Sequence, residues 1–156
     1  MEIFISNKKN IAHRYVNCAR ETIACYPEIL PIFVVLRRLL QLHHLHDHKR
    51  GGLKAFALFL LVYGMRCHYQ YSHISQFVEH FAYYYGWEYE FSGEVVGERA
   101  EFRINISDPL NPDNNLGGKH TDIDAVVGLL RRVYLGLQVP AHGSRLQYLV
   151  ELVQLS

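Results

Sequence analysis

The sequence predicts a mainly α-helical protein that carries one small β-hairpin. Apolar residues recur at helical spacing through most of the chain, whereas alternation with a period of two is confined to the first residues and to residues 87–106. The chain has 156 residues, of which 49% are hydrophobic and 20% are charged. Such a chain can bury one hydrophobic core, so we expect a single domain over residues 1–156.

Charge, cysteine content and hydropathy narrow the class of protein. The formal net charge is +1, so any contact with nucleic acid would be local. The three cysteines are widely spaced and odd in number, which predicts free thiols in a reducing compartment. The longest apolar run, residues 55–65, is shorter than the ~20 residues that span a bilayer. Residues 1–10 lack a secretory signal, so we expect an intracellular protein, cytoplasmic or nuclear, without a membrane partner.

The first part of the chain predicts a strand and two helices. The segment MEIFIS (1–6) alternates like a strand, and a strand needs a partner, so we interpret residues 1–10 as the end of a sheet that lies elsewhere. A helix is expected over residues 12–24, and a second helix after Pro31. The second helix has one apolar stripe at a spacing of three and four residues, formed by Ile32, Leu36, Leu39, Leu40 and His43.

The remaining elements follow from periodicity and from breaker residues. Residues 53–67 are apolar nearly all round, which is typical of a central, buried helix. Another helix is expected to open at Ser72 or His73 and to end at Gly86. The alternating stretches WEYEF and EFRINI predict the hairpin. Two more helices are expected, one opened by a capping box of Thr121 and Asp124, the other capped by Ser144.

The segment SDPLNPDNNLG (107–117) holds two prolines, two aspartates and three asparagines. Proline fixes φ, and Asn and Asp side chains bond to their own backbone, so such composition makes turns. The segment is therefore either a plain connector or a shaped backbone that holds a ligand.

The order of these motifs resembles the template-independent RNA nucleotidyltransferases, the group of poly(A) polymerases and terminal uridylyltransferases. The motifs are VVLRRLL, then GGLKAFALFLLV, then an aromatic helix end, then NISDPLNPDNNLGG followed by a helix. The segment from Gly51 to Tyr134 resembles the PAP-associated domain of that group. The resemblance implies that residues 11–156 form a helical central domain of the poly(A) polymerase type, and that residues 1–10 are the end of the catalytic-domain sheet.

The resemblance also implies roles for particular residues. Phe56 takes the place of the aromatic residue that stacks on the incoming base, and a phenyl ring can serve there. Arg37 stands where a lysine faces the triphosphate. Nucleotide recognition falls to Asp108, Asn111 and Asn114, and the Asn at 114 leans toward adenosine. Glu2 aligns with the third catalytic carboxylate, although the family uses Asp there.

The chain also departs from the family pattern. Lys54 and Ala55 replace two hydroxyl residues, Gln41 replaces a second cation, and the Gly-Ser and paired Asp-x-Asp motifs are absent. The family transfers a nucleotide from ATP, or another nucleoside triphosphate, to an RNA 3′ end, with Mg²⁺ held by those carboxylates. We therefore expect this chain to recognise the nucleotide, to be inactive alone, and to act with a partner or catalytic domain.

Two alternatives stay open. The chain could be a diverged, non-catalytic module that binds RNA or a protein. It could also be a metal-responsive protein built on the cluster of His43, His44, His46, His48 and Asp47, although a solvated helix end explains the cluster better and we predict no metal site. The aromatic residues Tyr83, Tyr84, Tyr85 and Trp87 could stack bases, but packing at a helix end is the preferred interpretation.

Overall fold

The computed structural model describes residues 2–47, 52–89, 92–96, 99–103, 106–117, 123–139 and 148–150. The helices are α1 (Glu2–Cys25), α2 (Ile29–Leu42), α3 (Ala55–His68), α4 (Ile74–Tyr83) and α5 (Ile123–Gln138), and a π-helical turn (Tyr84–Glu88) follows α4 directly. The strands are β1 (Ser92–Val96), β2 (Arg99–Arg103), β3 (Ser107–Asp108) and β4 (Asn111–Asn115). The predicted class, mainly α-helical with a small hairpin, is confirmed.

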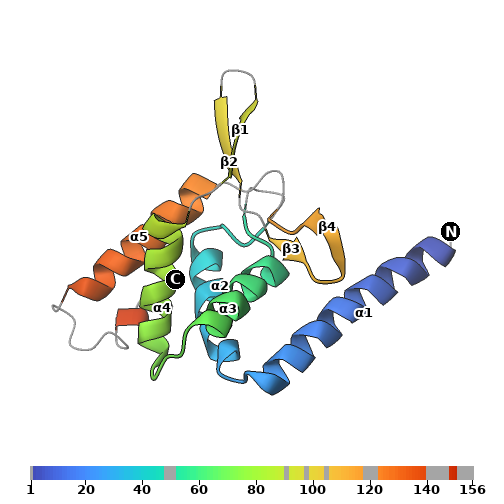
Figure 1. Ribbon diagram of the computed structural model, residues 1–156, viewed down its shortest axis with the longest axis horizontal. Coiled ribbons are helices and arrows are strands. Elements are labelled where there is room, and N and C mark those ends of the chain that lie inside the picture. The colour runs from blue at the N-terminus through green and yellow to red at the C-terminus, as the bar shows by residue number, and fades with distance from the viewer. Residues whose placement is uncertain are drawn as a thin grey trace.

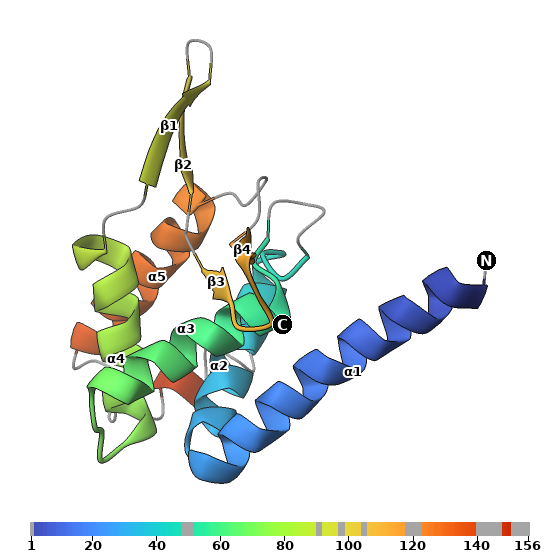
Figure 2. The same ribbon diagram turned by 45° about the vertical axis from the view of Figure 1, so that its right-hand side comes forward.

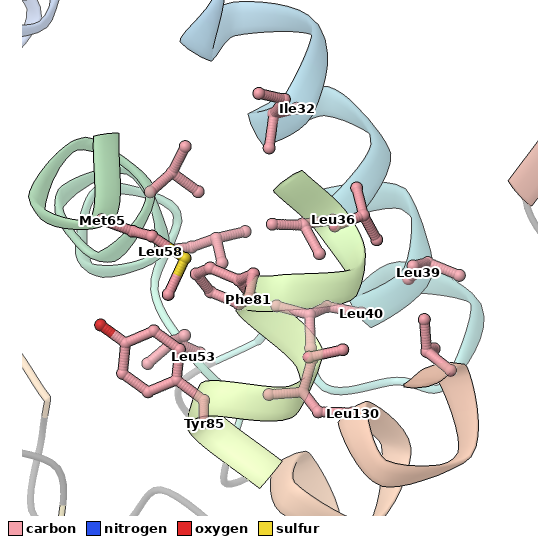
Figure 3. Close-up of a cluster of buried hydrophobic side chains, with 14 of the residues drawn as sticks. Ile32, Leu36, Leu39, Leu40, Leu53, Leu58, Met65, Phe81, Tyr85 and Leu130 are labelled. Carbon is pink, nitrogen blue, oxygen red and sulfur yellow. The ribbon is translucent and has the colours of Figure 1, made fainter. Parts of the chain in front are cut away.

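Helices α2 to α5 enclose the core, with α4 packed on α5 and α2 packed on α3 (Figure 1). Each helix turns its apolar stripe inward, because burial of apolar surface is the main force that holds such helices together. Figure 3 shows the centre of this core, where side chains from all four helices meet. Its buried members include Leu36, Leu40, Leu58, Met65, Phe81 and Leu130.

Helix α1 replaces the predicted N-terminal strand. Residues 2–6 form the first turns of this helix, so the strand prediction for Met1–Ser6 is wrong over the residues described. A helix satisfies its own backbone hydrogen bonds, whereas a lone strand leaves them unpaired. The N-terminal part of α1 projects away from the other helices in both views (Figures 1 and 2). Residues 2–10 therefore do not form the edge of a sheet, and Glu2 lies on a helix.

Helix α2 begins two residues before the proline that was expected to precede it. Pro31 is the third residue of the helix, where a backbone N–H has no partner inside the helix, so its missing N–H costs nothing. Ile32, Leu36, Leu39 and Leu40 are all buried, as the stripe predicts. His43 is different, because it is the exposed residue after the last turn.

The helix α4 continues into the π-helical turn instead of ending at Gly86. The alternation of Trp87, Glu88 and Tyr89 therefore does not mark a strand. The hairpin itself is confirmed further along, where β1 pairs antiparallel with β2 from Ser92 opposite Arg103 to Val96 opposite Arg99. It stands out from the helical body in both views (Figures 1 and 2).

The chain after β2 forms a second small hairpin, β3–β4, and then α5. The predicted helix over Ile123–Gln138 is confirmed, with Ile123, Leu130, Val133 and Leu137 buried. Thr121 of the predicted capping box, Pro140 and Ser144 lie outside the described residues. Of the last predicted helix the structure describes residues 148–150, which are helical, and Leu149 is buried against the core.

Two further properties follow from the described residues. No helix among them is both long enough and apolar enough to cross a membrane. All three cysteines, Cys18, Cys25 and Cys67, are free thiols, as their spacing predicts.

Candidate functional site

The segment 107–117 is a shaped backbone and not a plain connector. Strands β3 and β4 pair antiparallel around a turn at Pro109 and Leu110, with Asp108 opposite Asn111. The carboxylate of Asp108 fixes the turn, because its Oδ1 accepts the Leu110 N–H at 2.8 Å. Its Oδ2 accepts the Asn114 side-chain amide across the hairpin at 3.0 Å. Asp108 thus organises the hairpin from within.

Asparagines fix the ends of the same hairpin. The Oδ1 atom of Asn115 accepts the backbone N–H of Ile106 and that of Gly117, both at 2.9 Å. The backbone N–H of Leu116 also donates to the Ile106 carbonyl at 2.8 Å. Asn111 accepts the Asp113 N–H at 3.3 Å. The asparagine-rich composition therefore serves first to build this backbone, and the side chains of Asn111 and Asn114 remain exposed.

Tyr15 of α1 joins the hairpin to helix α3. Its hydroxyl donates a hydrogen bond to Asp108 Oδ2, and its ring meets the ring of Phe56 edge to face with centroids 4.9 Å apart. Phe56 and Asp108, far apart in sequence, therefore flank one side chain. The sequence reasoning missed Tyr15. The available signal was its place on one face of the helix with Ala19 and Ile23, where a half-buried tyrosine needs a partner for its hydroxyl.

Asp108 is buried, with 1% of its surface exposed, and its electrostatics reflect its donors. Burial alone raises the pKa of this carboxyl, but the hydrogen bonds from Tyr15, Asn114 and the backbone of Leu110 and Asn111 outweigh burial and hold the pKa below its ordinary value. The carboxylate is therefore charged at neutral pH, with the chain's own donors on both oxygens.

The pKa of Tyr15 shifts in the opposite direction to that of Asp108. Its hydrogen bond to Asp108, its burial and the charge of Asp108 raise the pKa of Tyr15 to about 12, although Arg14 opposes the shift. The tyrosine therefore stays protonated and keeps donating to the carboxylate over the neutral range.

A groove with a volume of about 270 Å³ opens beside Phe56, between α1, α2 and α3. The ring of Phe59 stacks on that of Phe56 with centroids 6.0 Å apart, and Phe33 meets Phe59 edge to face at 5.8 Å. The groove is almost wholly apolar, and Asp108 is not among its lining residues, although Tyr15, which lines it, donates to Asp108. Its lining suits a largely apolar group.

The other predicted site residues do not join this cluster. Arg37 lies half-buried on α2 and makes no hydrogen bond or ion pair within the described part of the chain. Glu2 is in the first turn of α1, on the projecting end of that helix (Figure 1). The structure thus brings together Phe56, Asp108 and Asn114, with Asn111 at the edge of the same hairpin.

No group of three or more His, Cys, Asp or Glu side chains that could hold a metal ion occurs among the described residues. In the histidine cluster, His43 and His44 are exposed, and His48 lies outside the described residues. Partial burial, Arg132 and His44 together lower the pKa of His43. The positive charge of Arg132 so close by works against a cation at this point.

The aromatic end of α4 packs on α5. Tyr83, Trp87 and Tyr134 form a three-ring cluster with centroids 5.1–5.8 Å apart. Arg131 donates to the Gly86 carbonyl at 2.7 Å and lies 5.6 Å from the Trp87 ring centroid. These contacts agree with the prediction of packing at a helix end.

Comparisons with protein-family models, with curated proteins and with solved structures gave no match. The likeness to the RNA nucleotidyltransferases therefore rests on the sequence motifs, and what it implies is a proposal.

Proposed function

We propose that this chain recognises the base of a nucleoside triphosphate, in the manner of the nucleotide-recognition part of a poly(A) polymerase-like RNA terminal nucleotidyltransferase. The observation that supports this most directly is the meeting of Phe56 with the Asp108 hairpin around Tyr15. The sequence motifs assign base recognition to Phe56 and to the Asp108 hairpin. These two parts of the structure lie on either side of the Tyr15 side chain. Free cysteines agree with an intracellular setting.

The sequence motif favours adenine over uracil through Asn114. An aromatic ring supplies stacking worth roughly 1–3 kcal/mol for any base, so Phe56 provides affinity without selectivity. Asp108 accepts hydrogen bonds only, so it suits the amino group of adenine and equally the N3–H group of uracil. A bound amino group would compete with the Tyr15 hydroxyl for Asp108 Oδ2.

The described residues do not fit a Mg²⁺ site. The one buried acid, Asp108, has donors from the chain on both oxygens, and no cluster of acids gathers within the described ranges. The proposal is therefore nucleotide recognition alone. Transfer of a nucleotide to an RNA 3′ end would require a partner or domain that supplies the carboxylates, and Arg37 would contribute positive charge toward the triphosphate.

A second candidate function is a non-catalytic module that binds RNA or a protein. The apolar groove favours it, because Val16 and Leu30, which line it, remain exposed, to 47% and 43%. Exposed apolar side chains around a groove are typical of a protein-binding surface. The occupied carboxylate of Asp108 also favours this candidate.

Calorimetric titration of the folded chain with ATP and with UTP, each with Mg²⁺, tests the proposal. We expect saturable ATP binding and UTP binding weaker by about tenfold, since the sequence motif leans toward adenosine at Asn114. Phe56→Leu keeps the apolar volume but loses the aromatic face, and should weaken ATP binding about fivefold or more.

Tyr134→Leu is the matched control, because Tyr134 lies in the ring cluster on α5, away from Phe56. It should leave ATP binding unchanged. If neither nucleotide binds to a chain whose circular dichroism shows folded helices, nucleotide recognition is excluded, and the second candidate function stands.

A further inference from the structure

A second hollow lies on the other side of α3, away from Phe56. It has a volume of about 400 Å³ and is bounded by the C-terminal half of α3 and by the π-helical turn. The residues that line it are Gly64, Met65, His68, Tyr69, Tyr84 and Tyr85. None of them belongs to the Phe56–Asp108 site, so this pocket is separate from the one proposed to recognise the nucleotide.

The π-helical turn builds one wall of the pocket. The Tyr89 N–H donates to the Tyr84 carbonyl at 2.8 Å, five residues back, which is the wider spacing of a π-helix. The two consecutive residues Tyr84 and Tyr85 both reach the pocket, and their rings meet edge to face with centroids 4.9 Å apart. A π-turn in an otherwise regular helix is uncommon and is often found where a side chain has a functional position.

A third ring that lines the pocket, Tyr69, is 46% exposed. Tyr69 and Tyr84 both contact the ring of His80, with centroids 4.5 and 6.5 Å apart. The Tyr71 hydroxyl in turn hydrogen-bonds His80 Nδ1. His80 therefore supports both rings, although it does not line the pocket itself.

The floor of the pocket is open because residue 64 is a glycine. Glycine in the interior of a helix is destabilising relative to alanine, so the presence of glycine at position 64 needs an explanation. Packing is not the reason, since a Cβ atom added at Gly64 would meet nothing within 4 Å. The absence of a side chain here leaves room in the pocket.

The charges around the pocket favour a positive ligand. Among the described residues that line it there is no lysine or arginine. Aromatic rings present a negative face, and a cation within about 6 Å of a ring centroid is attracted to it. Glu88 adds a full negative charge near Tyr84, where it contributes, after burial and neighbouring tyrosines, to a raised pKa of that hydroxyl.

We propose that this pocket binds a small organic cation with an alkylated ammonium group. The rings of Tyr69, Tyr84 and Tyr85 would surround the charge, and the Met65 side chain would contact its alkyl groups. Among the described residues that line the pocket, His68 is the side chain that can become positive, and a phosphate or other anion finds no lysine or arginine there. A neutral apolar ligand would gain no electrostatic attraction from the rings or from Glu88.

The test is a titration with choline, followed by NMR of the tyrosine rings and by calorimetry. A parallel titration uses the tert-butyl analogue of choline, in which carbon replaces nitrogen. We expect choline to saturate with a Kd of about 1 mM, and the uncharged analogue to bind at least about tenfold more weakly, since it loses the attraction to the rings.

Two matched variants locate the site. Gly64→Leu fills the pocket from its floor and should abolish choline binding. Gly128→Leu makes the same change on α5, where an added Cβ also meets nothing within 4 Å, and should leave binding unchanged. The proposal is overturned if wild-type chain shows no saturation up to about 50 mM choline, far above the expected Kd. Equal binding of the analogue, or full binding by Gly64→Leu, would also overturn it.

Discussion

At the scale of single residues, the contact between Tyr15 and Asp108 connects helix α1 to the β3–β4 hairpin. Asp108 was expected from its place in the loop, and the structure shows why an acid is suited to it. Both of its oxygens accept hydrogen bonds, from Tyr15, Asn114 and the backbone of the turn. A hydrogen bond to a charged group is worth about 1.5–3 kcal/mol, more than a neutral one.

The contact predicts how stability depends on pH. The pKa of Asp108 is lowered by folding, so its contribution is present above its unfolded pKa and is lost as pH falls through the folded value. The pKa of Tyr15 is raised to about 12, so its contribution is complete below an unfolded pKa of about 10 and is lost as pH rises to about 12. Tyr15→Phe should therefore lower the free energy of unfolding by about 1–3 kcal/mol at pH 7.

Urea unfolding followed by circular dichroism at a series of pH values measures this difference. The difference between wild type and Tyr15→Phe should shrink between pH 10 and pH 12, where the wild-type hydroxyl ionises. Tyr134→Phe serves as a control, because Tyr134 contacts Tyr83 and Trp87 and no acid is described beside it. A difference that persists undiminished at pH 12 would contradict the assigned hydrogen bond.

At the scale of elements, helical periodicity predicted α2, α4 and α5, because burial fixes which residues form an inward stripe. Helix α3 was predicted instead from a run that is apolar nearly all round. Alternation of apolar residues with a period of two predicted strands less well. Ile3 and Ile5 alternate like a strand, yet they belong to α1, where a helix satisfies backbone groups that a lone strand leaves open. Trp87 and Tyr89 also alternate like strand residues. Trp87 belongs to the π-helical turn and Tyr89 follows that turn, so their large rings lie at the end of a helix.

The candidate site could be predicted from the sequence only in part. The turn-forming composition of residues 107–117 marked a shaped loop, and Phe56 was assigned from the motifs. Their meeting depends on Tyr15, which is 93 residues from Asp108 in the chain. No local pattern encodes such a distant hydrogen bond, so it had to be seen in three dimensions.

Two helices carry glycines that packing does not require. Gly64→Ala in α3 and Gly128→Ala in α5 should each raise the free energy of unfolding by about 0.5–1 kcal/mol, because the added Cβ meets nothing and alanine favours the helix. Gly52→Ala should do the opposite, since its Cβ would lie 2.5 Å from the Leu45 carbonyl carbon. Thermal unfolding checks all three, and destabilisation by Gly64→Ala would mean that α3 is packed differently.

At the scale of the whole molecule, the helical body has two projecting parts, the β1–β2 hairpin and the N-terminal part of α1 (Figures 1 and 2). Among the side chains of α1 that the structure describes, Tyr15, Ala19 and Ile23 line the groove beside α2 and α3. The backbone of the earlier turns projects away from the other helices, so we expect packing to give it little help (Figures 1 and 2). Short helices without tertiary contacts are marginal in water.

We therefore expect a gradient of amide protection along α1. In hydrogen exchange measured by mass spectrometry, residues 4–12 should exchange within about 10²-fold of the unfolded rate, and residues 16–25 should be protected much longer. Tyr15→Ala should extend the fast region toward the C-terminal end of α1. Uniform protection along the whole helix would contradict this expectation and would indicate that another molecule covers its first turns.

The order of synthesis gives the Tyr15–Asp108 contact a further consequence. Ribosomes add roughly 5–20 residues per second, so the 93 residues that separate the two take roughly 5–20 s to make. During that interval the nascent α1 can pack on α2 and α3 but lacks its hydrogen bond to Asp108. The contacts of this helix are thus completed only after translation has delivered the hairpin.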